Sequence, residues 1–388
     1  MPRVLIASDK FKGSLTAVEV ADAVGRGLRR GCPDVDVAVV PIADGGDGTV
    51  AAALAAGFAA VEVTASGPTG ERVRARYARR GDVAVVELAG VSGLSLLPGG
   101  RLAPLSASSR GTGEVIGAAV TAGCRKVVVG IGGSASTDGG AGLVQALGAR
   151  FRDGVGCSVR PGGEGLADLA TIDLAWLRGL MSGVQVTVAG DVDNPLTGPL
   201  GAAAVYGPQK GADPDQVLLL DRALGHFADR VAAVTGVDHR DVPGAGAAGG
   251  VGFALVALLG AELRSGIDLV LDLVDFDTRL DGVDLVVTGE GSLDEQTLHG
   301  KAVAGVAGRA AVRAIPVVAV CGQSTLDPVA LQAAGVSCAY PLTDLEPDLE
   351  ECKRNAAALL QRIGEQIAAD HLTSPSTSTK HPERRVSA

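Results

Sequence analysis

Short apolar runs alternate with amphipathic segments at the N-terminal end of the chain. Residues 3–8 form an apolar run that suits a buried parallel strand, and a second run covers residues 37–42. Between them, apolar residues recur at helical spacing after Thr16 and Glu19, which have the spacing of a capping box. An alanine-rich segment that suits a helix follows the second run. This order of strands and helices predicts a parallel sheet with crossover helices.

The same alternation returns in the last part of the chain. Apolar runs that suit strands are separated by segments with helical periodicity, and the last of these has apolar residues along one face. The predicted strands are 284–291, with its loop, 315–322 and 336–340, and the predicted helices are 299–312, 327–334 and 349–367. Both ends of the chain are therefore expected to contribute to one Rossmann-like parallel-sheet domain of the α/β class, discontinuous in sequence.

The middle of the chain has a different pattern. Residues 61–66, 71–80 and 83–90 are β-rich segments joined by short turns, which is the spacing of antiparallel hairpins. A helix at 112–122 and a buried strand at 126–133 are predicted after them. We therefore expect an inserted second domain of mixed α/β type. The expected limits are 1–60 plus 284–370 for the Rossmann-like domain, 61–283 for the inserted domain, and 371–388 for a disordered tail without apolar periodicity.

Composition narrows the class of protein. The formal net charge of −10 over 388 residues disfavours nucleic acid and anionic membranes as partners. No stretch approaches the roughly 18 consecutive apolar residues of a membrane-spanning helix, and the N-terminus lacks a signal-peptide pattern. The six cysteines are scattered without a CxxC pair, so reduced thiols of a cytoplasmic protein are expected and metal binding by them is disfavoured. The 56 glycines are expected in loops where the backbone approaches a ligand.

Three short motifs resemble known signatures but lack their context. Gly244, Gly246 and Gly249 spell G-x-G-x-x-G, yet the strand that a dinucleotide fingerprint requires does not precede them. Residues 239–241 spell HRD without the rest of the protein-kinase signature set. Lys301 follows a glycine as at the end of a P-loop, but the other Walker A positions differ. A nucleotide site must therefore use other residues.

Five loops combine glycine or hydroxyl residues with lysine or carboxylate residues, each at or near the end of a predicted strand. They are residues 8–14, 44–49, 130–140, 190–196 and 288–294. Phosphoryl transfer needs backbone N–H groups and cations for phosphate, carboxylates for Mg²⁺, and a base beside the acceptor hydroxyl. Each loop alone also fits an ordinary turn or helix start. Several of them are expected to meet at one crevice outside the carboxyl ends of the strands.

Long segments around these loops resemble the glycerate kinase family of the bacterial, two-domain type. The matching segments are ASDKFKGSL (7–15), IADGGDGT (42–49), SRGTGEVI (109–116), GIGGSASTDGGAG (130–142), GDVDNPLTGPLGAAAVYGPQKGA (190–212), GAAGGVGFAL (246–255) and DLVVTGEGSLDEQTLHGKAVAGVA (284–307). The resemblance implies transfer of the γ-phosphoryl group of ATP to D-glycerate with Mg²⁺, usually giving 2-phosphoglycerate. It also implies a Rossmann-like domain and a second mixed α/β domain, with the site in the cleft between them. Monomeric and homodimeric forms both stay open.

With this resemblance, each loop can be given a role. Lys10 and Lys12 would bind the anionic substrate or the transferring phosphate, and Asp191 and Asp193 would hold Mg²⁺. The expected phosphate cradle consists of Gly132, Gly133, Ser134, Ser136 and Thr137 with Lys301. The candidates for the base or a second metal ligand are Asp44, Asp47, Glu290 and Asp294.

The chain departs from the family pattern near these loops. Thr137 stands where the family often has Asn, and Ser292 stands where it often has Arg. The helix after Lys301 lacks a proline that is often found nearby. Loss of an Arg beside a carboxylate-bearing loop would weaken recognition of an anionic substrate or shift its register.

Two other functions compete with the kinase. A hydroxy-acid dehydrogenase is favoured only by the misplaced G-x-G-x-x-G. A catalytically silent regulator would bind a sugar acid or a nucleotide without turnover. The lysine and aspartate loops favour the kinase, because a pure sensor has no need of several carboxylates beside a glycine-rich loop.

Overall fold

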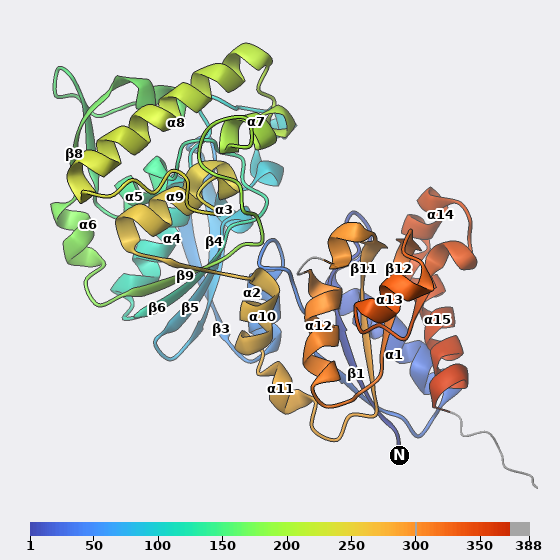
Figure 1. The fold of residues 1–388 in the computed structure, drawn as a ribbon. Helices are drawn as coiled ribbons and strands as arrows, with labels where there is room; N and C mark the ends of the chain where they lie inside the picture. Colours follow the sequence, from blue (N-terminus) through green and yellow to red (C-terminus); the bar gives the residue numbers. More distant parts are fainter. Residues whose placement is uncertain (299–300, 373–388) are drawn as a thin grey trace, which may run out of the picture.

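A five-stranded parallel sheet is built from the two ends of the chain (Figure 1). The computed structural model describes residues 1–298 and 301–372. The strands lie in the order β13, β12, β11, β1, β2, and every neighbouring pair is parallel. Their bounds are β1 Arg3–Ser8, β2 Asp36–Val39, β11 Leu285–Leu293, β12 Val317–Ser324 and β13 Cys338–Pro341. The Rossmann-like sheet expected from discontinuous segments is confirmed.

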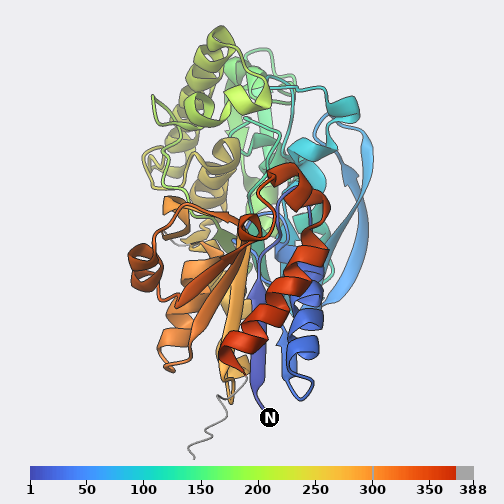
Figure 2. The ribbon, with the colours of Figure 1, turned by 90° about the vertical axis from the view of Figure 1, so that its right-hand side faces the viewer.

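The strands of this sheet are apolar on both faces because helices cover both. Val4 and Ile6 of β1 pack in one cluster with α1 (Ala17–Gly31) and α15 (Ala356–His371). The alternate residues Leu5 and Ala7 point to the other face, where they pack with α10 (Gly266–Leu273) and α12 (Ala302–Ala311). Figure 2 shows α1 and α15 side by side over one face of the sheet.

A second sheet of six strands is built from the middle of the chain. Its order is β10, β9, β6, β5, β4, β3. The pairs β3–β4 and β4–β5 are antiparallel, as the hairpin spacing predicts, and the remaining pairs are parallel. The bounds are β3 Ala59–Ser66, β4 Arg72–Arg80, β5 Val83–Glu87, β6 Lys126–Gly130, β9 Gln185–Ala189 and β10 Glu262–Arg264, beside a separate antiparallel pair, β7 Arg150–Asp153 and β8 Leu169–Asp173. The mixed α/β character expected for this part is confirmed.

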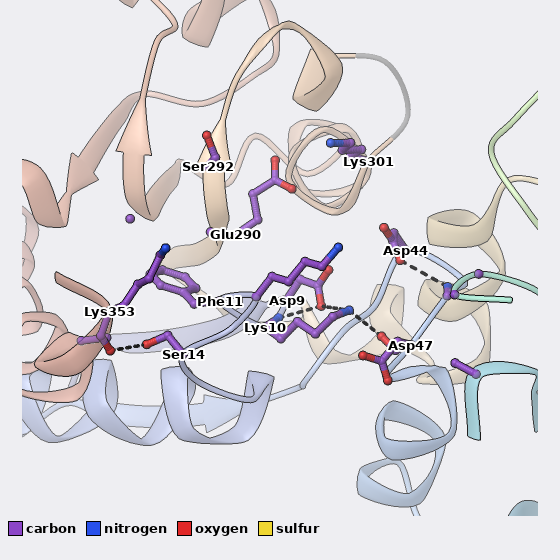
Figure 3. A pocket seen from close by; sticks show the side chains of 18 of the residues that line it. Asp9, Lys10, Phe11, Ser14, Asp44, Asp47, Glu290, Ser292, Lys301 and Lys353 are labelled. Carbon is purple, nitrogen blue, oxygen red and sulfur yellow. Dashed lines mark hydrogen bonds and ion pairs between the residues drawn. The ribbon is translucent and has the colours of Figure 1, made fainter. Parts of the chain in front are cut away.

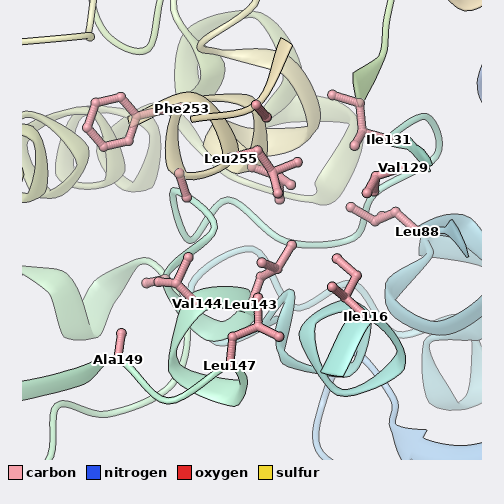
Figure 4. Close-up of a cluster of buried hydrophobic side chains, with 14 of the residues drawn as sticks. Leu88, Ile116, Val129, Ile131, Leu143, Val144, Leu147, Ala149, Phe253 and Leu255 are labelled. Atoms are coloured by element: carbon pink, nitrogen blue, oxygen red, sulfur yellow. The ribbon is translucent and has the colours of Figure 1, made fainter. Parts of the chain in front are cut away.

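Helices on one face of the second sheet bury its largest apolar cluster (Figure 4). Leu88 and Val129, from the sheet side, meet Ile116 of α4, Leu143 of α5 and Phe253 of α9 in this cluster. The helices of this part are α3 Ala89–Ser92, α4 Arg110–Thr121, α5 Ala141–Ala146, α6 Ala175–Leu180, α7 Ala202–Tyr206, α8 Pro214–Thr235 and α9 Ala247–Leu259. Aromatic residues are few, so most of the packing is between Ala, Val and Leu side chains.

Two helices lie between the sheets. Although α2 (Thr49–Ala55) follows the second strand of the first sheet, its residue Val50 packs with Val85 and Val128 of the second sheet. Within α10, Ile267 belongs to the core of the first sheet and Leu269 packs with residues of the second. The chain then passes through α11 (Phe276–Arg279) to β11. The domain limits expected at residues 60 and 283 stay predictions, since both helices are shared in this way.

Most predicted elements are present, with shifts at their ends. The capping box is formed, because Thr16 Oγ1 accepts from Glu19 N while Thr16 N donates to Glu19 Oε2. The predicted last helix is divided at Asn355 into α14 (Leu349–Arg354) and α15. Strand β11 runs to Leu293, through residues expected in a loop, because it continues to pair with β12. The remaining helix is α13 (Pro328–Ala333).

Some of the predicted segments include residues that the structure does not describe. Residues 299–300, at the expected start of α12, and 373–388, most of the expected disordered tail, lie outside the described residues. Gly244 and Gly246 of the G-x-G-x-x-G motif precede α9, Gly249 lies in its first turn, and no strand directly precedes them. In the described part of the chain, no helix is long and apolar enough to cross a membrane.

Candidate active site

One large cavity lies where loops from both sheets meet (Figure 3). Its volume is about 1140 Å³. Asp9 follows β1, and Glu290 and Gly322 belong to the carboxyl-terminal ends of β11 and β12 in the first sheet. Glu87 ends β5 and Gly132 follows β6 in the second sheet. The carboxyl ends of strands from two sheets therefore form one pocket, where ligands bind in open α/β proteins.

The cavity lies at the switch point of the first sheet. Numbered along the chain, its strands have the order 2-1-3-4-5, in which the chain reverses its winding between β1 and β11. Asp9 and Lys10 leave β1 at this place, and Asp9 N donates to Gly289 O of β11 at 2.9 Å. Lys10 Nζ donates to the carbonyl oxygen of Asp47 at 2.6 Å and so ties two cavity loops together.

Asp9 has an environment unusual for a carboxylate. Burial raises the pKa of Asp9 to about 7; Lys10 opposes this rise, and the charges of Asp44 and Glu290 add to it. Its Oδ1 atom accepts from Lys10 N at 2.6 Å and lies 3.7 Å from Lys10 Nζ. A carboxyl group with a pKa near neutrality is suited to exchange protons with a bound hydroxyl. Asp9 belongs to the candidate loop 8–14, but no role was predicted for it from the sequence.

Glu87 is a second cavity carboxylate that the sequence analysis missed. It accepts from Gly48 N at 3.1 Å and from Val50 N at 3.0 Å, which fixes the loop before α2. Burial raises the pKa of Glu87 to about 7, and the neighbouring charge of Asp47 contributes to the rise. The sequence feature that could have indicated Glu87 is a single acidic residue at the end of an apolar strand.

Glu290 and Lys301 face the same space from the first sheet. Glu290 Oε1 accepts from Thr297 Oγ1 at 2.5 Å. Burial raises the pKa of Glu290, while Thr297 and Lys301 act in the opposite direction and Asp294 and Asp44 raise it further. The predicted candidates Lys10, Lys12, Asp44, Asp47, Gly132, Gly133, Glu290, Asp294 and Lys301 all line this one cavity.

Four of the seven lysines in the chain line the cavity, which is a strong local concentration of positive charge in an acidic protein. They are Lys10, Lys12, Lys301 and Lys353. Lys353 was not predicted from the sequence, because only the tertiary fold brings α14 to the cavity. Its carbonyl oxygen accepts from Ser14 Oγ at 2.6 Å, which holds α14 against the loop after β1.

Ser134, Ser136 and Thr137, predicted for the phosphate cradle, are buried and do not border the cavity. The buried Lys210 donates from Nζ to Ser134 Oγ at 2.8 Å and to Ser136 O at 2.5 Å. Burial lowers the pKa of Lys210 to about 7. Lys210, which was not predicted from the sequence, therefore anchors the 130–140 loop on the side away from the cavity. Of the five cradle residues predicted in this loop, only Gly132 and Gly133 line the cavity.

Asp191 and Asp193, predicted to hold Mg²⁺, also lie outside the cavity lining. Asp191 Oδ1 accepts from Gly266 N at 2.8 Å, so the carboxylate fixes the start of α10. Burial raises the pKa of Asp191, and the nearby charge of Asp44 adds to the effect. Asp193 is exposed. Within residues 1–298 and 301–372, no three His, Cys, Asp or Glu side chains are arranged to hold a metal ion by themselves.

Comparison with known proteins gives the family. The sequence model of the glycerate kinase family matches residues 4–372. The chain belongs to the glycerate kinase family. A Bacillus subtilis (strain 168) protein named glycerate kinase is 45% identical over 370 residues, which cover 95% of this chain and 97% of that protein. An Escherichia coli (strain K12) protein named glycerate 2-kinase is 42% identical over 370 residues, with the same coverage of 95% and 97%.

A solved structure gives the same result for the fold. A chain from Salmonella typhimurium LT2, described as glycerate kinase 2, is similar with a TM-score of 0.82 and 44% sequence identity. The similarity covers 95% of this chain and 98% of that chain. The α/β architecture of this glycerate kinase family member is therefore shared along nearly its whole length.

Two of the three departures from the family pattern, Ser292 and Thr137, lie in different surroundings. Ser292 lines the cavity, where its Oγ atom accepts from Gln323 Nε2 at a long 3.4 Å. Thr137 is buried, and its Oγ1 atom has no hydrogen-bond partner among the residues that the structure describes. Of these two departures, only that at Ser292 therefore changes the wall of the cavity in this family member.

Glycines allow the cavity loops to touch one another. A Cβ atom on Gly132 would lie 2.8 Å from Gly46 Cα, closer than such atoms approach. We expect Gly132→Ala to lower the free energy of unfolding by about 1–3 kcal/mol, because the backbones of the two loops must separate. Chemical denaturation measures this. Gly90→Ala is the control, since Gly90 lines the same cavity but its Cβ would meet no atom within 4 Å. Equal stability of the two variants would show that the loops do not depend on this contact.

Proposed function

We propose that this chain is a kinase that transfers the γ-phosphoryl group of ATP to D-glycerate, with Mg²⁺, and that the product is 2-phosphoglycerate. The observation that carries the proposal is the cavity at the switch point, which combines four lysines with buried carboxylates. Both reactants are anions, so lysine ammonium groups supply their attraction and neutralise charge during transfer. The names of the two bacterial relatives support glycerate as the acceptor.

The carboxylates of the cavity fit Mg²⁺. Asp44 raises the pKa values of both Asp9 and Glu290, so these groups repel one another in a partly dry site. A divalent cation relieves this repulsion, and Mg²⁺ prefers one or two carboxylates together with phosphate and water oxygens. We assign Asp44 and Glu290 to hold it. When bound, the ion would neutralise charge on the phosphate oxygens.

Asp9 is the proposed base. As the hydroxyl oxygen of glycerate attacks the γ-phosphorus, its proton passes to the Asp9 carboxylate, and the bond from the γ-phosphorus to the bridging oxygen breaks to release ADP. Its buried position at the end of β1 and its raised pKa support this role. Lys10 would hold either the glycerate carboxylate or the transferring phosphoryl group, since its ammonium group lies beside Asp9.

A coupled assay of ADP release across small hydroxy acids tests the function. We expect turnover with D-glycerate and Mg²⁺-ATP, and phosphorus NMR of the product distinguishes the 2-phosphate from the 3-phosphate. Reduction of a nicotinamide with glycerate would instead identify a dehydrogenase. Calorimetric binding of glycerate or ATP without turnover would identify a silent regulator.

A further inference from the structure

The cavity has two chemically different ends. Figure 3 shows Asp44 and Asp47 at one end and Phe11, Ser14 and Lys353 at the other, with Asp9 and Lys10 between them. The end at α14 is apolar: its lining includes Phe11, Leu342, Leu349, Cys352 and Ala356. These residues come from the loop after β1, from the segment after β13 and from α14 and α15.

Hydrogen bonds fix the walls of the apolar end of the cavity. Ser14 Oγ donates to Lys353 O at 2.6 Å, and this bond closes the loop after β1 against α14. Cys352 Sγ donates to Glu346 O at 2.9 Å, which fixes the thiol in the wall. Leu349 keeps 43% of its surface exposed, whereas the other four apolar lining residues expose 4% or less, so Leu349 is the apolar side chain that a bound group would cover.

The polar groups at this end are Ser14, Gln323 and Lys353, and the ammonium group of Lys353 is paired with Glu350 Oε1 at 2.7 Å. The side-chain amide of Gln323, at the carboxyl end of β12, makes only the long 3.4 Å contact to Ser292 Oγ among the side-chain hydrogen bonds of the described residues. Its amide therefore has both a donor and an acceptor to offer to a heterocycle. The backbone nitrogen of Lys12 would lie 3.5 Å from a Cβ atom on Gly291 of β11, and Lys12 lines the same cavity as Glu290.

Glycerate does not match this apolar end. Each of its three carbons bears oxygen, so it has no apolar face that Phe11 or Leu349 could cover. A purine ring has two apolar faces and a polar edge, which fits an apolar slot with one amide at its rim. The cavity volume of about 1140 Å³ also exceeds what glycerate alone would fill.

We propose that the end of the cavity at α14 binds the adenine base of ATP, with its triphosphate running past Lys12 toward Glu290 and Asp44. This inference rests on the proposed function for the identity of the nucleotide. It assigns α14 and Gln323 to base recognition and leaves the acidic end, with Asp9 and Lys10, for glycerate and the transferred group. The nucleotide thus lies on the first sheet, away from the buried hydroxyls of the 134–137 loop.

The test separates binding of the base from binding of the phosphates. In Leu349→Ser and in Gln323→Leu, calorimetry is expected to show ATP and ADP bound about five- to tenfold more weakly, since each variant removes one contact to the base. Binding of inorganic tripolyphosphate, which has phosphates but no base, should stay within about twofold of the wild type. The KM for D-glycerate should also be unchanged.

Leu218→Ser is the matched control, since Leu218 is an exposed leucine of α8 that does not line the cavity. Unchanged ATP binding in both cavity variants would overturn the inference, and so would equal weakening of ATP and tripolyphosphate. If the two cavity variants showed the expected loss of ATP binding but the wild type did not phosphorylate glycerate, the proposed function would be wrong and the base site would still be supported.

Discussion

Replacing Asp9 by Asn is expected to lower kcat by a factor of about 10² to 10⁴, the usual contribution of a positioned acid–base group. The amide keeps the size of the side chain and can still accept from Lys10 N, so the loop after β1 should keep its path. What is lost is the site that takes the proton of the glycerate hydroxyl. The KM values for ATP and glycerate should change much less than kcat, because Asp9 acts on the reacting hydroxyl.

The same substitution is expected to stabilise the folded chain at high pH. The pKa of Asp9 is about 7 in the folded chain, above the ordinary value of 3.8. The folded state therefore holds a proton that the unfolded chain has lost between these two values, so the wild type loses stability as pH rises through this window. Without metal or nucleotide, Asp9→Asn should be more stable than the wild type by about 3 kcal/mol near pH 8, and by much less near pH 4.

Asp22→Asn is the control for both measurements, since Asp22 is an exposed carboxylate on α1 outside the cavity. Steady-state kinetics and chemical denaturation at the two pH values measure the opposite effects on turnover and stability. Turnover within threefold of the wild type, a bound of about 0.6 kcal/mol, would remove Asp9 from the role of base. A loss of stability at high pH would contradict the electrostatic explanation. A gain in stability together with a loss of activity is the pattern of a strained functional site.

The fold was largely predictable from the sequence because the strands of each sheet have a characteristic pattern of apolar residues. Residues 3–8 are continuously apolar since helices cover both faces of β1, whereas the hairpin of β3 and β4 alternates because one face is exposed. The break at Asn355 and the sharing of α2 and α10 between the sheets were not predictable in this way. They depend on contacts between segments far apart in sequence.

The candidate site was only partly predictable for a related reason. Loops at strand ends meet because parallel strands share a carboxyl edge, and this placed Lys10, Asp44 and Glu290 together. The glycines of the 130–140 loop were interpreted as a ligand cradle, yet Gly132 and Gly139 also make room for neighbouring loops or side chains. A local pattern cannot distinguish close approach to a ligand from close approach to another part of the chain. Glu87 and Lys353 were missed because only tertiary packing brings them to the cavity.

Asp44→Asn is expected to lower kcat by about two orders of magnitude and to raise the Mg²⁺ concentration needed for half-maximal activity. Asp191→Asn should change both quantities by less than about fivefold. The reason is geometric: Asp44 lines the cavity, whereas Asp191 lies outside it and accepts from Gly266 N. An asparagine at position 191 can keep this hydrogen bond through its carbonyl oxygen. Titration of activity with Mg²⁺ at saturating ATP and glycerate measures the difference.

This comparison decides between two locations for the metal. Asp191 and Asp193 were predicted from the sequence to hold Mg²⁺, whereas the cavity geometry favours Asp44 and Glu290. Asp193→Asn is a useful third variant, because Asp193 is exposed and its neutralisation should leave the Mg²⁺ dependence unchanged. If Asp191→Asn impaired Mg²⁺ use as strongly as Asp44→Asn, the metal would have to bind between them. Asp44 and Asp191 are close enough for this, since the charge of Asp44 raises the pKa of Asp191. A Cβ atom on Gly266 would also contact both residues.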